Sequence, residues 1–200
     1  MPGKANASKP SARERLLAAA DELFYREGVQ SVGVDRVVQK AGVAKASLYN
    51  LFGSKEELVE AYLDARREAS REQLERALTR FRTPRERLLG VFDAQGQIFT
   101  EPDFNGCAHM TANAEARQGG PIECANDRYR QWVRTTFTDL AREAGAPDPD
   151  ELARQLHLLY DGAGISAHMD HDPSAATTAR AAAAALFDAA TKNEKALADR

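Results

Sequence analysis

The chain has 200 residues and a formal net charge of −3. Hydrophobic residues make up 43% and charged residues 28% of it, which is an ordinary composition for a globular protein. Two cysteines exclude a disulfide-stabilised scaffold and a cysteine-rich zinc module, and no apolar run is long enough to span a membrane. The first ten residues lack the apolar core of a signal peptide, so we expect a cytoplasmic protein without a membrane partner.

Charge is divided unevenly along the chain. Residues 1–55 contain nine Lys/Arg and five Asp/Glu, a net charge of +4, whereas residues 56–200 carry a net charge of −7. A basic N-terminal part is the electrostatic footprint expected of a segment that binds phosphates. Residues 1–10 are expected to form a disordered N-terminal arm.

Capping signals delimit the first helices. Ser11 with Glu14 forms a capping box that opens a helix over 12–27, and Gly28 ends this helix. The apolar positions of the helix repeat at 3.6-residue spacing, which predicts one buried face. A short helix over 34–40 follows, with its valines directed inward.

A tight turn at Ala41 and Gly42 connects that helix to the next one, over 45–52. Leu48 and Phe52 share an inward face of this second helix at i, i+4 spacing. The outward face is small, polar and cationic, and it consists of Lys45, Ala46, Ser47, Tyr49 and Asn50.

A helix face of this kind fits the major groove of DNA, where short polar side chains read base edges. Lys45 and Tyr49, together with Lys55 just beyond the helix, are expected to hold phosphates. The alternative is an ordinary helical hairpin whose polar face is simply solvated.

Residues 13–63 as a whole resemble the DNA-binding domain of the TetR family of transcriptional repressors. The resemblance depends on AGVAKASLYNLF for the turn and recognition helix and on SKEEL, from Ser54 to Leu58, at the start of the next helix. It implies a helix-turn-helix DNA-binding domain over 11–54 and a ligand-binding and dimerisation domain over 55–200. It also implies a homodimer that binds a palindromic double-stranded DNA operator and that a small-molecule effector releases.

Two positions depart from the pattern of the family. Members commonly have Thr at the position of Gly33 and Ser at that of Ala44, so two hydroxyl contacts are lost here. Gly33 remains a predicted DNA-binding position, because glycine still caps a helix and backbone amides at a helix N-terminus attract phosphate.

The rest of the chain is predicted to be helical, which makes the protein all-α with about nine helices. Capping signals occur at Ser54, Thr83 and Asp148, and Asp172 before Pro173 opens the last helix. The predicted helices cover 55–80, 84–100, 105–117, 121–144, 149–169 and 173–195.

Aromatic residues are concentrated in the middle of the C-terminal domain, and apolar walls with a few polar groups are typical of a small-molecule pocket. His109 and Asn113, four residues apart, are expected on one inward helix face. The alternative is that these side chains form the core. The predicted ligand-binding residues are Phe92, Phe99, Phe104, His109, Met110, Asn113, Trp132 and Tyr160.

The last two helices contain small residues that allow close approach of helix backbones. In the TetR family the final two helices pair across a twofold axis, so the resemblance implies a homodimer interface here. The alternative is an alanine-rich helix packed within its own subunit. The predicted dimerisation residues are Gly162, Gly164, Ala183, Leu186 and Phe187.

Other chemistries have weaker support. His168, His171 and Asp172 share a helical face as metal ligands would, but the negative end of a helix dipole also favours histidines. Cys107 and Cys124 are interpreted as reduced, with a redox role left open. There is no nucleophile–base pair, no HExxH motif and no glycine-rich phosphate loop, so we predict neither catalysis nor a cofactor. A helical adaptor without DNA binding is the main alternative function, and an enzyme acting on small molecules is a weaker one.

Overall fold

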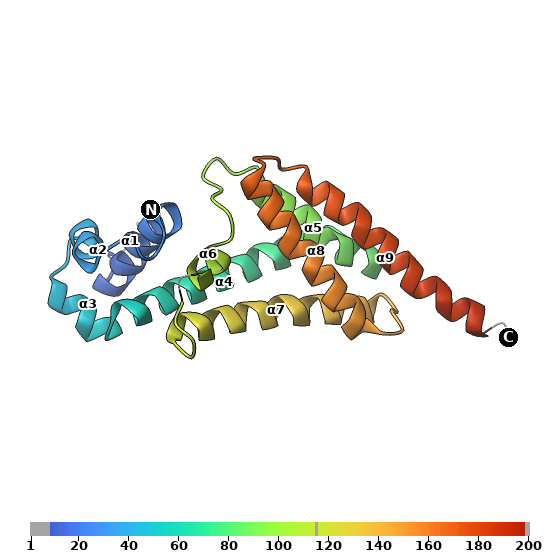
Figure 1. The fold of residues 1–200 in the computed structure, drawn as a ribbon, viewed down its shortest axis with the longest axis horizontal. Coiled ribbons are helices and arrows are strands. Elements are labelled where there is room, and N and C mark those ends of the chain that lie inside the picture. The colour runs from blue at the N-terminus through green and yellow to red at the C-terminus, as the bar shows by residue number, and fades with distance from the viewer. Residues whose placement is uncertain (1–8, 115, 199–200) are drawn as a thin grey trace, which may run out of the picture. The chain divides into compact units, whose positions relative to one another are not determined.

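The computed structural model describes residues 9–114 and 116–198, with side chains up to Thr191, and these residues form nine α-helices and no strand (Figure 1). The predicted all-α class is therefore confirmed, whereas residues 1–8 of the predicted arm lie outside the described residues. The chain divides into two compact units, Met1–Ala65 with Met110–Ala125, and Arg66–His109 with Asn126–Arg200. The functional domains 11–54 and 55–200 stay a prediction.

Three short helices open the first unit: α1 (Ala12–Glu27), α2 (Val34–Ala41) and α3 (Lys45–Phe52). The Glu14 amide donates to Ser11 Oγ (3.2 Å), and the Ser11 amide donates to Glu14 Oε2 (2.7 Å). This is the predicted capping box at the start of α1. Gly28, with a φ of 83°, ends the helix. The predicted bounds of all three helices are confirmed to within one residue.

The core of this unit is formed by the apolar stripes of the three helices. Leu16 and Phe24 of α1 and Leu48 of α3 are at most 2% exposed. Arg15 Nε donates to the carbonyl of Ala41 (3.1 Å), which holds α1 to the end of α2. The long helix α4 (Lys55–Leu78) follows, and its start is capped as predicted by Ser54 Oγ, which accepts from the amide of Glu57 (3.1 Å).

The turn between α2 and α3 depends on Gly42, which has a left-handed φ of 63°. A Cβ added to Gly42 meets nothing within 4 Å, so a larger residue is opposed only by backbone strain. We therefore expect Gly42→Ala to lower the free energy of unfolding by about 1 kcal/mol in urea denaturation. Gly42→Asn is the control and should lose less of the free energy of unfolding, because asparagine adopts a left-handed conformation more readily than alanine does. Equal losses for the two variants would contradict the strain argument.

The second unit contains α5 (Pro84–Phe99), α8 (Pro149–Met169) and α9 (Ala175–Ala198), which pack on one another. It also contains the later part of α7 (Pro121–Glu143). Arg85 pairs with Asp188 and Arg180 pairs with Asp93, each at 3.0 Å, so α9 is tied to α5 at two places.

Close packing of α9 on α5 depends on small side chains. A Cβ added to Gly96 would lie 3.0 Å from the Cβ of Ala176. The capping residues predicted for two helices of this unit are confirmed. Thr83 accepts from the amide of Glu86 at the start of α5, and Asp148 accepts from the amide of Glu151 at the start of α8.

Two predicted helices start or end elsewhere. The helix expected over 105–117 is α6 and covers only Ala108–Ala114, because Gly106 has a φ of 80° that interrupts helical geometry. The last helix begins at Ala175 rather than 173, since the Asp172 carboxylate accepts from the Ser174 amide (2.8 Å) and hydroxyl (2.7 Å) in a turn before it. Within the described part of the chain, no helix has the length and apolarity to cross a membrane.

Candidate functional site

Helix α3 presents most of its eight residues to solvent. Leu48 is fully buried, whereas Lys45, Ala46, Tyr49 and Asn50 are exposed and Ser47 is half-buried. The structure therefore brings the predicted outward residues together on one side of a short helix. Its buried side holds the helix against α1 and α2.

Lys45, the cationic residue of this face, forms an ion pair with a neighbouring carboxylate. Lys45 Nζ lies 2.8 Å from Asp35 Oδ1, and this hydrogen bond raises the pKa of Lys45. Both side chains are at least half exposed, so the pair is weak and a phosphate can replace the carboxylate at low cost. Gly33 is exposed at the N-cap of α2, where no side chain caps the helix.

Lys55 lies differently from the prediction. It was expected to hold a phosphate, but it is half-buried and its ammonium donates a hydrogen bond to the carbonyl of Val29 (2.6 Å). The physical reason is the position of Lys55 in the first turn of α4, which faces the segment after α1. A phosphate contact by Lys55 stays a prediction.

One exposed residue of α3 was not included among the predicted contacts. Leu51 is 43% exposed, close to the 45% of Tyr49, although both are large and partly apolar. Exposed apolar side chains of this size on a short polar helix are typical of a binding surface. The sequence signal was available, because Leu51 lies outside the i, i+4 pair of Leu48 and Phe52.

The aromatic residues predicted to bind a ligand are mostly core residues of the second unit. Phe92 is fully buried and packs against Phe137 and Tyr160, with ring centroids 5.7 and 6.4 Å away. Phe99 and Phe104 pack together at 5.0 Å. The core interpretation, which the sequence left open, therefore describes these three phenylalanines.

His109 is buried and has protein partners. Its ring stacks on Tyr129 with centroids 4.0 Å apart, and its Nδ1 lies 3.2 Å from Asn126 Oδ1. Asn113, in contrast, is exposed, which corrects its predicted place on an inward face, and the predicted ligand-binding residue Met110 is exposed as well. The reason is that α6 has only two turns and buries its residues 109 and 112, leaving residue 113 outside.

A small cavity of about 10 Å³ does lie in this interior, room for about one water molecule. Two of the predicted ligand-binding residues, Trp132 and Tyr160, line it. The other lining residues are Leu74, Val91, Val133, Thr136 and Phe137. They come from α4, α5 and α7, whose helical periodicity alone does not show which faces meet.

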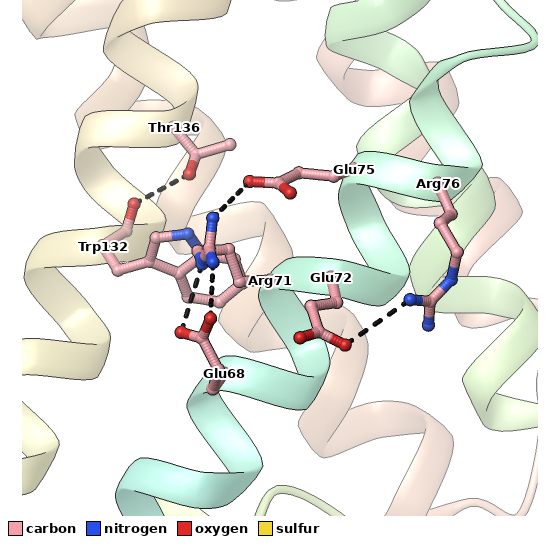
Figure 2. Close-up of polar contacts among 7 residues, drawn as sticks. All are labelled: Glu68, Arg71, Glu72, Glu75, Arg76, Trp132 and Thr136. Carbon is pink, nitrogen blue, oxygen red and sulfur yellow. Dashed lines mark hydrogen bonds and ion pairs between the residues drawn. The ribbon is translucent and has the colours of Figure 1, made fainter. Parts of the chain in front are cut away.

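A charged cluster on α4 lies beside the cavity. Figure 2 shows Arg71 between Glu68 and Glu75, with Trp132 and Thr136 on the neighbouring helix α7. Arg71 Nη1 lies 2.7 Å from Glu75 Oε1, and Arg71 also pairs with Glu68, which raises the pKa of Arg71. Thr136 Oγ1 donates to the Trp132 carbonyl (2.9 Å).

Residues 16–62 match the bacterial regulatory proteins of the tetR family. The solved structure of SCO4454, a TetR-family transcriptional regulator from Streptomyces coelicolor, is 32% identical, with a TM-score of 0.82 over 90% of this chain and 95% of that one. The structure of sav143 from Streptomyces avermitilis, described as a TetR-type transcriptional regulator, is 38% identical, with a TM-score of 0.79 over 91% of this chain and 99% of that one.

The chain belongs to the TetR family of transcriptional regulators. A further relative, the HTH-type transcriptional activator FasR of Mycolicibacterium smegmatis, is 35% identical over 136 residues, which are 66% of this chain and 60% of FasR. Regulation of transcription through DNA, the function of this family, is consistent with the exposed polar face of α3.

The α8 helix of this TetR-family regulator has an exposed apolar stripe. Leu158 is 73% exposed, Ile165 40% and Met169 71%, and the exposed Gly162 lies between them. The spacing of four, three and four residues places all four on one face of the helix. None of the three large residues was predicted, although the same periodicity is visible in the sequence.

The predicted dimerisation residues fall into two groups. Gly162 is exposed, and Gly164 and Leu186 are half-buried. Ala183 and Phe187 are at most 5% exposed and belong to the core of the subunit itself. They contribute to the packing of α9 on α5 and α8, and a role in a dimer interface stays a prediction.

No group of three His, Cys, Asp or Glu side chains within the described ranges is arranged to hold a metal ion. The helical face proposed for His168, His171 and Asp172 does not form, because α8 ends at Met169 and His171 has a φ of 53°. Neither Cys107, which is half-buried, nor the exposed Cys124 is in a disulfide bond.

Tyr129, which is buried, and Tyr160, which is half-buried, are expected to make the stability of this regulator depend on pH. Burial raises the pKa of Tyr160 to about 12 and raises that of Tyr129 well above its ordinary value. The unfolded chain loses these protons near pH 10 and the folded chain later, so stability is complete below pH 10 and falls as the pH rises towards 12. Each tyrosine contributes a slope of up to about 1.4 kcal/mol per pH unit.

In urea denaturation between pH 9 and 12, we expect the free energy of unfolding to fall less steeply with pH for Tyr160→Phe than for the native chain. Tyr49→Phe, at an exposed position, is the control and should keep the native slope. The same slope in all three proteins would exclude the buried hydroxyl as its cause.

Proposed function

We propose that this TetR-family protein is a homodimeric repressor that binds a palindromic DNA operator and is released by a small-molecule effector. The observation that carries the proposal is the exposed face of α3, on which Ala46, Ser47 and Asn50 can approach base edges while Lys45 and Tyr49 meet phosphates. Regulation by binding alone requires no catalytic residue, and access to DNA requires a cytoplasmic location.

Dimerisation is supported by the apolar stripe on α8. A subunit that leaves Leu158 and Met169 more than two thirds exposed loses the hydrophobic free energy of burying them, about 1.5–3 kcal/mol for each side chain. A second copy of the same stripe, placed by a twofold axis, covers both. The exposed Gly162 in the middle of the stripe allows the two α8 helices to approach closely.

Two DNA-binding domains, called heads here, on one dimer explain how a small basic surface binds DNA tightly. A head with a net charge of +4 binds weakly alone, but two heads about 34 Å apart meet successive major grooves on one side of the duplex. The second head then binds at high effective concentration. An operator with twofold symmetry follows from the twofold symmetry of the protein.

The effector site is proposed around the cavity lined by Trp132 and Tyr160. Its lining is apolar and aromatic, with Thr136 as a polar group, which is the usual chemistry of a small-molecule pocket. With a volume of about 10 Å³ the cavity must enlarge to admit a ligand, which links binding to a shift of α4 or α7. Such a shift gives the effector different affinities for the two states of the protein, as release of DNA requires.

A transcriptional activator is the second candidate. The name of the relative FasR describes an activator, and FasR is 35% identical over 136 residues. The two candidates share the DNA-binding surface and the dimer. They differ in the effect on transcription when the protein is bound at its operator.

The proposal is tested by a gel-shift titration of the protein on duplex DNA from upstream of its own gene, followed by selection of binding sites from random duplexes. We expect salt-dependent binding and a selected site with twofold symmetry. A reporter gene behind that site should be transcribed less when the protein is present. Higher transcription would indicate an activator, and the absence of any salt-dependent binding to duplex DNA would favour the adaptor alternative.

A further inference from the structure

The first compact unit contains a hollow of about 270 Å³ that includes no residue of α3. It is far larger than the 10–15 Å³ needed for one water molecule, and it is close to the lower limit of about 300 Å³ for ligand pockets. Three parts of the chain surround it: the start of the α1–α2 connection, the first turns of α4 and the segment that leads into α7. The lining residues are Val29, Gln30, Ser54, Lys55, Glu56, Val59, Arg117, Gly120, Pro121 and Ile122.

One side of the hollow is apolar. Val29, Val59 and Ile122 line it and are at most 6% exposed, so their side chains are fixed by the surrounding core. A wall of this kind favours the apolar body of a ligand, which gains about 25 cal/mol for each Å² that it removes from water.

The lining also includes two cations, Lys55 and Arg117. The Lys55 ammonium is held in place by its hydrogen bond to the Val29 carbonyl (2.6 Å). Arg117 lies at the rim with a side chain that is 87% exposed, and its Nε is 4.0 Å from Glu56 Oε1. An exposed pair at this distance contributes little, so the guanidinium can turn to a stronger partner at almost no cost.

We propose that this hollow binds a small organic carboxylate with an apolar body, with Arg117 and Lys55 facing the carboxylate and Val29, Val59 and Ile122 facing the body. Arginine can hold a carboxylate through two parallel hydrogen bonds, and the exposed guanidinium of Arg117 is available for such a pair. The site is separate from the proposed effector cavity and does not depend on it. A bound carboxylate connects residues 117–122 to the α1–α2 connection and to the start of α4.

Isoleucine methyl NMR provides the test, because the chain has only three isoleucines. Ile122 lines the hollow, whereas Ile98 lies in α5 and Ile165 lies in the exposed stripe of α8. On titration of the full-length protein with benzoate, we expect a saturable shift of the Ile122 δ1 methyl signal and none at Ile98 or Ile165.

Two comparisons test the role of charge. Arg117→Gln should weaken benzoate binding about tenfold, while Arg26→Gln, which also removes an exposed arginine with a 4.0 Å ion pair, should leave it unchanged. Benzamide, a neutral molecule of the same shape, should bind about tenfold more weakly than benzoate. Gel-shift affinity for DNA without benzoate should be the same for both variants and the native protein, because neither arginine is in α3.

The proposal would be overturned by an unmoved Ile122 signal, by a shift at Ile98 instead, or by equal binding in Arg117→Gln. Equal binding of benzamide and benzoate would overturn the choice of a carboxylate. None of these outcomes changes the DNA affinity of the protein, so failure here is distinguishable from failure of the proposed regulatory function.

Discussion

Replacing Leu158 by glutamate is expected to convert the dimer into monomers and to weaken operator binding by at least about a hundredfold. Leu158 is 73% exposed in the subunit, so the substitution removes no contact from the core. In the proposed dimer, however, the twofold axis brings two copies of the stripe together. Each glutamate would then be taken out of water without a partner, which costs several kcal/mol per charge.

Light scattering coupled to size-exclusion chromatography measures the first effect, and a gel-shift titration on the selected operator measures the second. Leu158→Met is the matched control, because it keeps an apolar side chain of similar volume and should stay dimeric. Circular dichroism should show the same helix content in both variants. A dimeric Leu158→Glu protein with native affinity for the operator would place the dimer interface elsewhere.

Much of this fold could be predicted from local signals. The capping residues Ser11, Ser54, Thr83 and Asp148 satisfy amides of the first turn of a helix, which is a contact between residues three apart. Such contacts are readable from the sequence because both partners lie in one short segment. The helix starts at these four positions are accordingly where the sequence places them.

The candidate sites were harder to predict, because they depend on which helix faces meet. Periodicity shows that α9 has a face of small residues, but it does not show that Ala183 and Phe187 pack on α5 of the same subunit. Asn113 follows the helical spacing from His109, yet α6 is too short to bury it. In both cases a local pattern does not determine a long-range contact.

The stripe on α8 shows a different limit. The sequence of this helix contains two apolar stripes, one through Leu152 and Leu156 that is buried and one through Leu158 and Ile165 that is exposed. A single sequence does not separate a stripe that fills the core of its own subunit from one that a partner covers. Only the exposed fractions in the folded subunit distinguish them.

Ala46→Glu is expected to abolish operator binding without destabilising the protein. Ala46 is exposed and is the second residue of α3, which has no acidic residue in its first turn. A glutamate near a helix N-terminus interacts favourably with the helix dipole, by about 0.3–1 kcal/mol, so the free energy of unfolding should stay the same or rise slightly. In the proposed complex with DNA, the same carboxylate would face phosphates and base edges in both DNA-binding domains of the dimer. We therefore expect affinity to fall by at least about a hundredfold, since one unfavourable contact occurs twice.

Ala65→Glu is the matched control for this change, because it introduces the same charge at an exposed position ten residues into α4, about 15 Å along the helix axis from its start. It should bind the operator with nearly native affinity, and urea denaturation should show native stability for both variants within about 1 kcal/mol. The comparison separates the surface of α3 from the total charge of the protein, since both variants become more negative by the same amount. Equal losses of affinity would mean that net charge alone governs binding, and native affinity in Ala46→Glu would mean that α3 does not enter the groove.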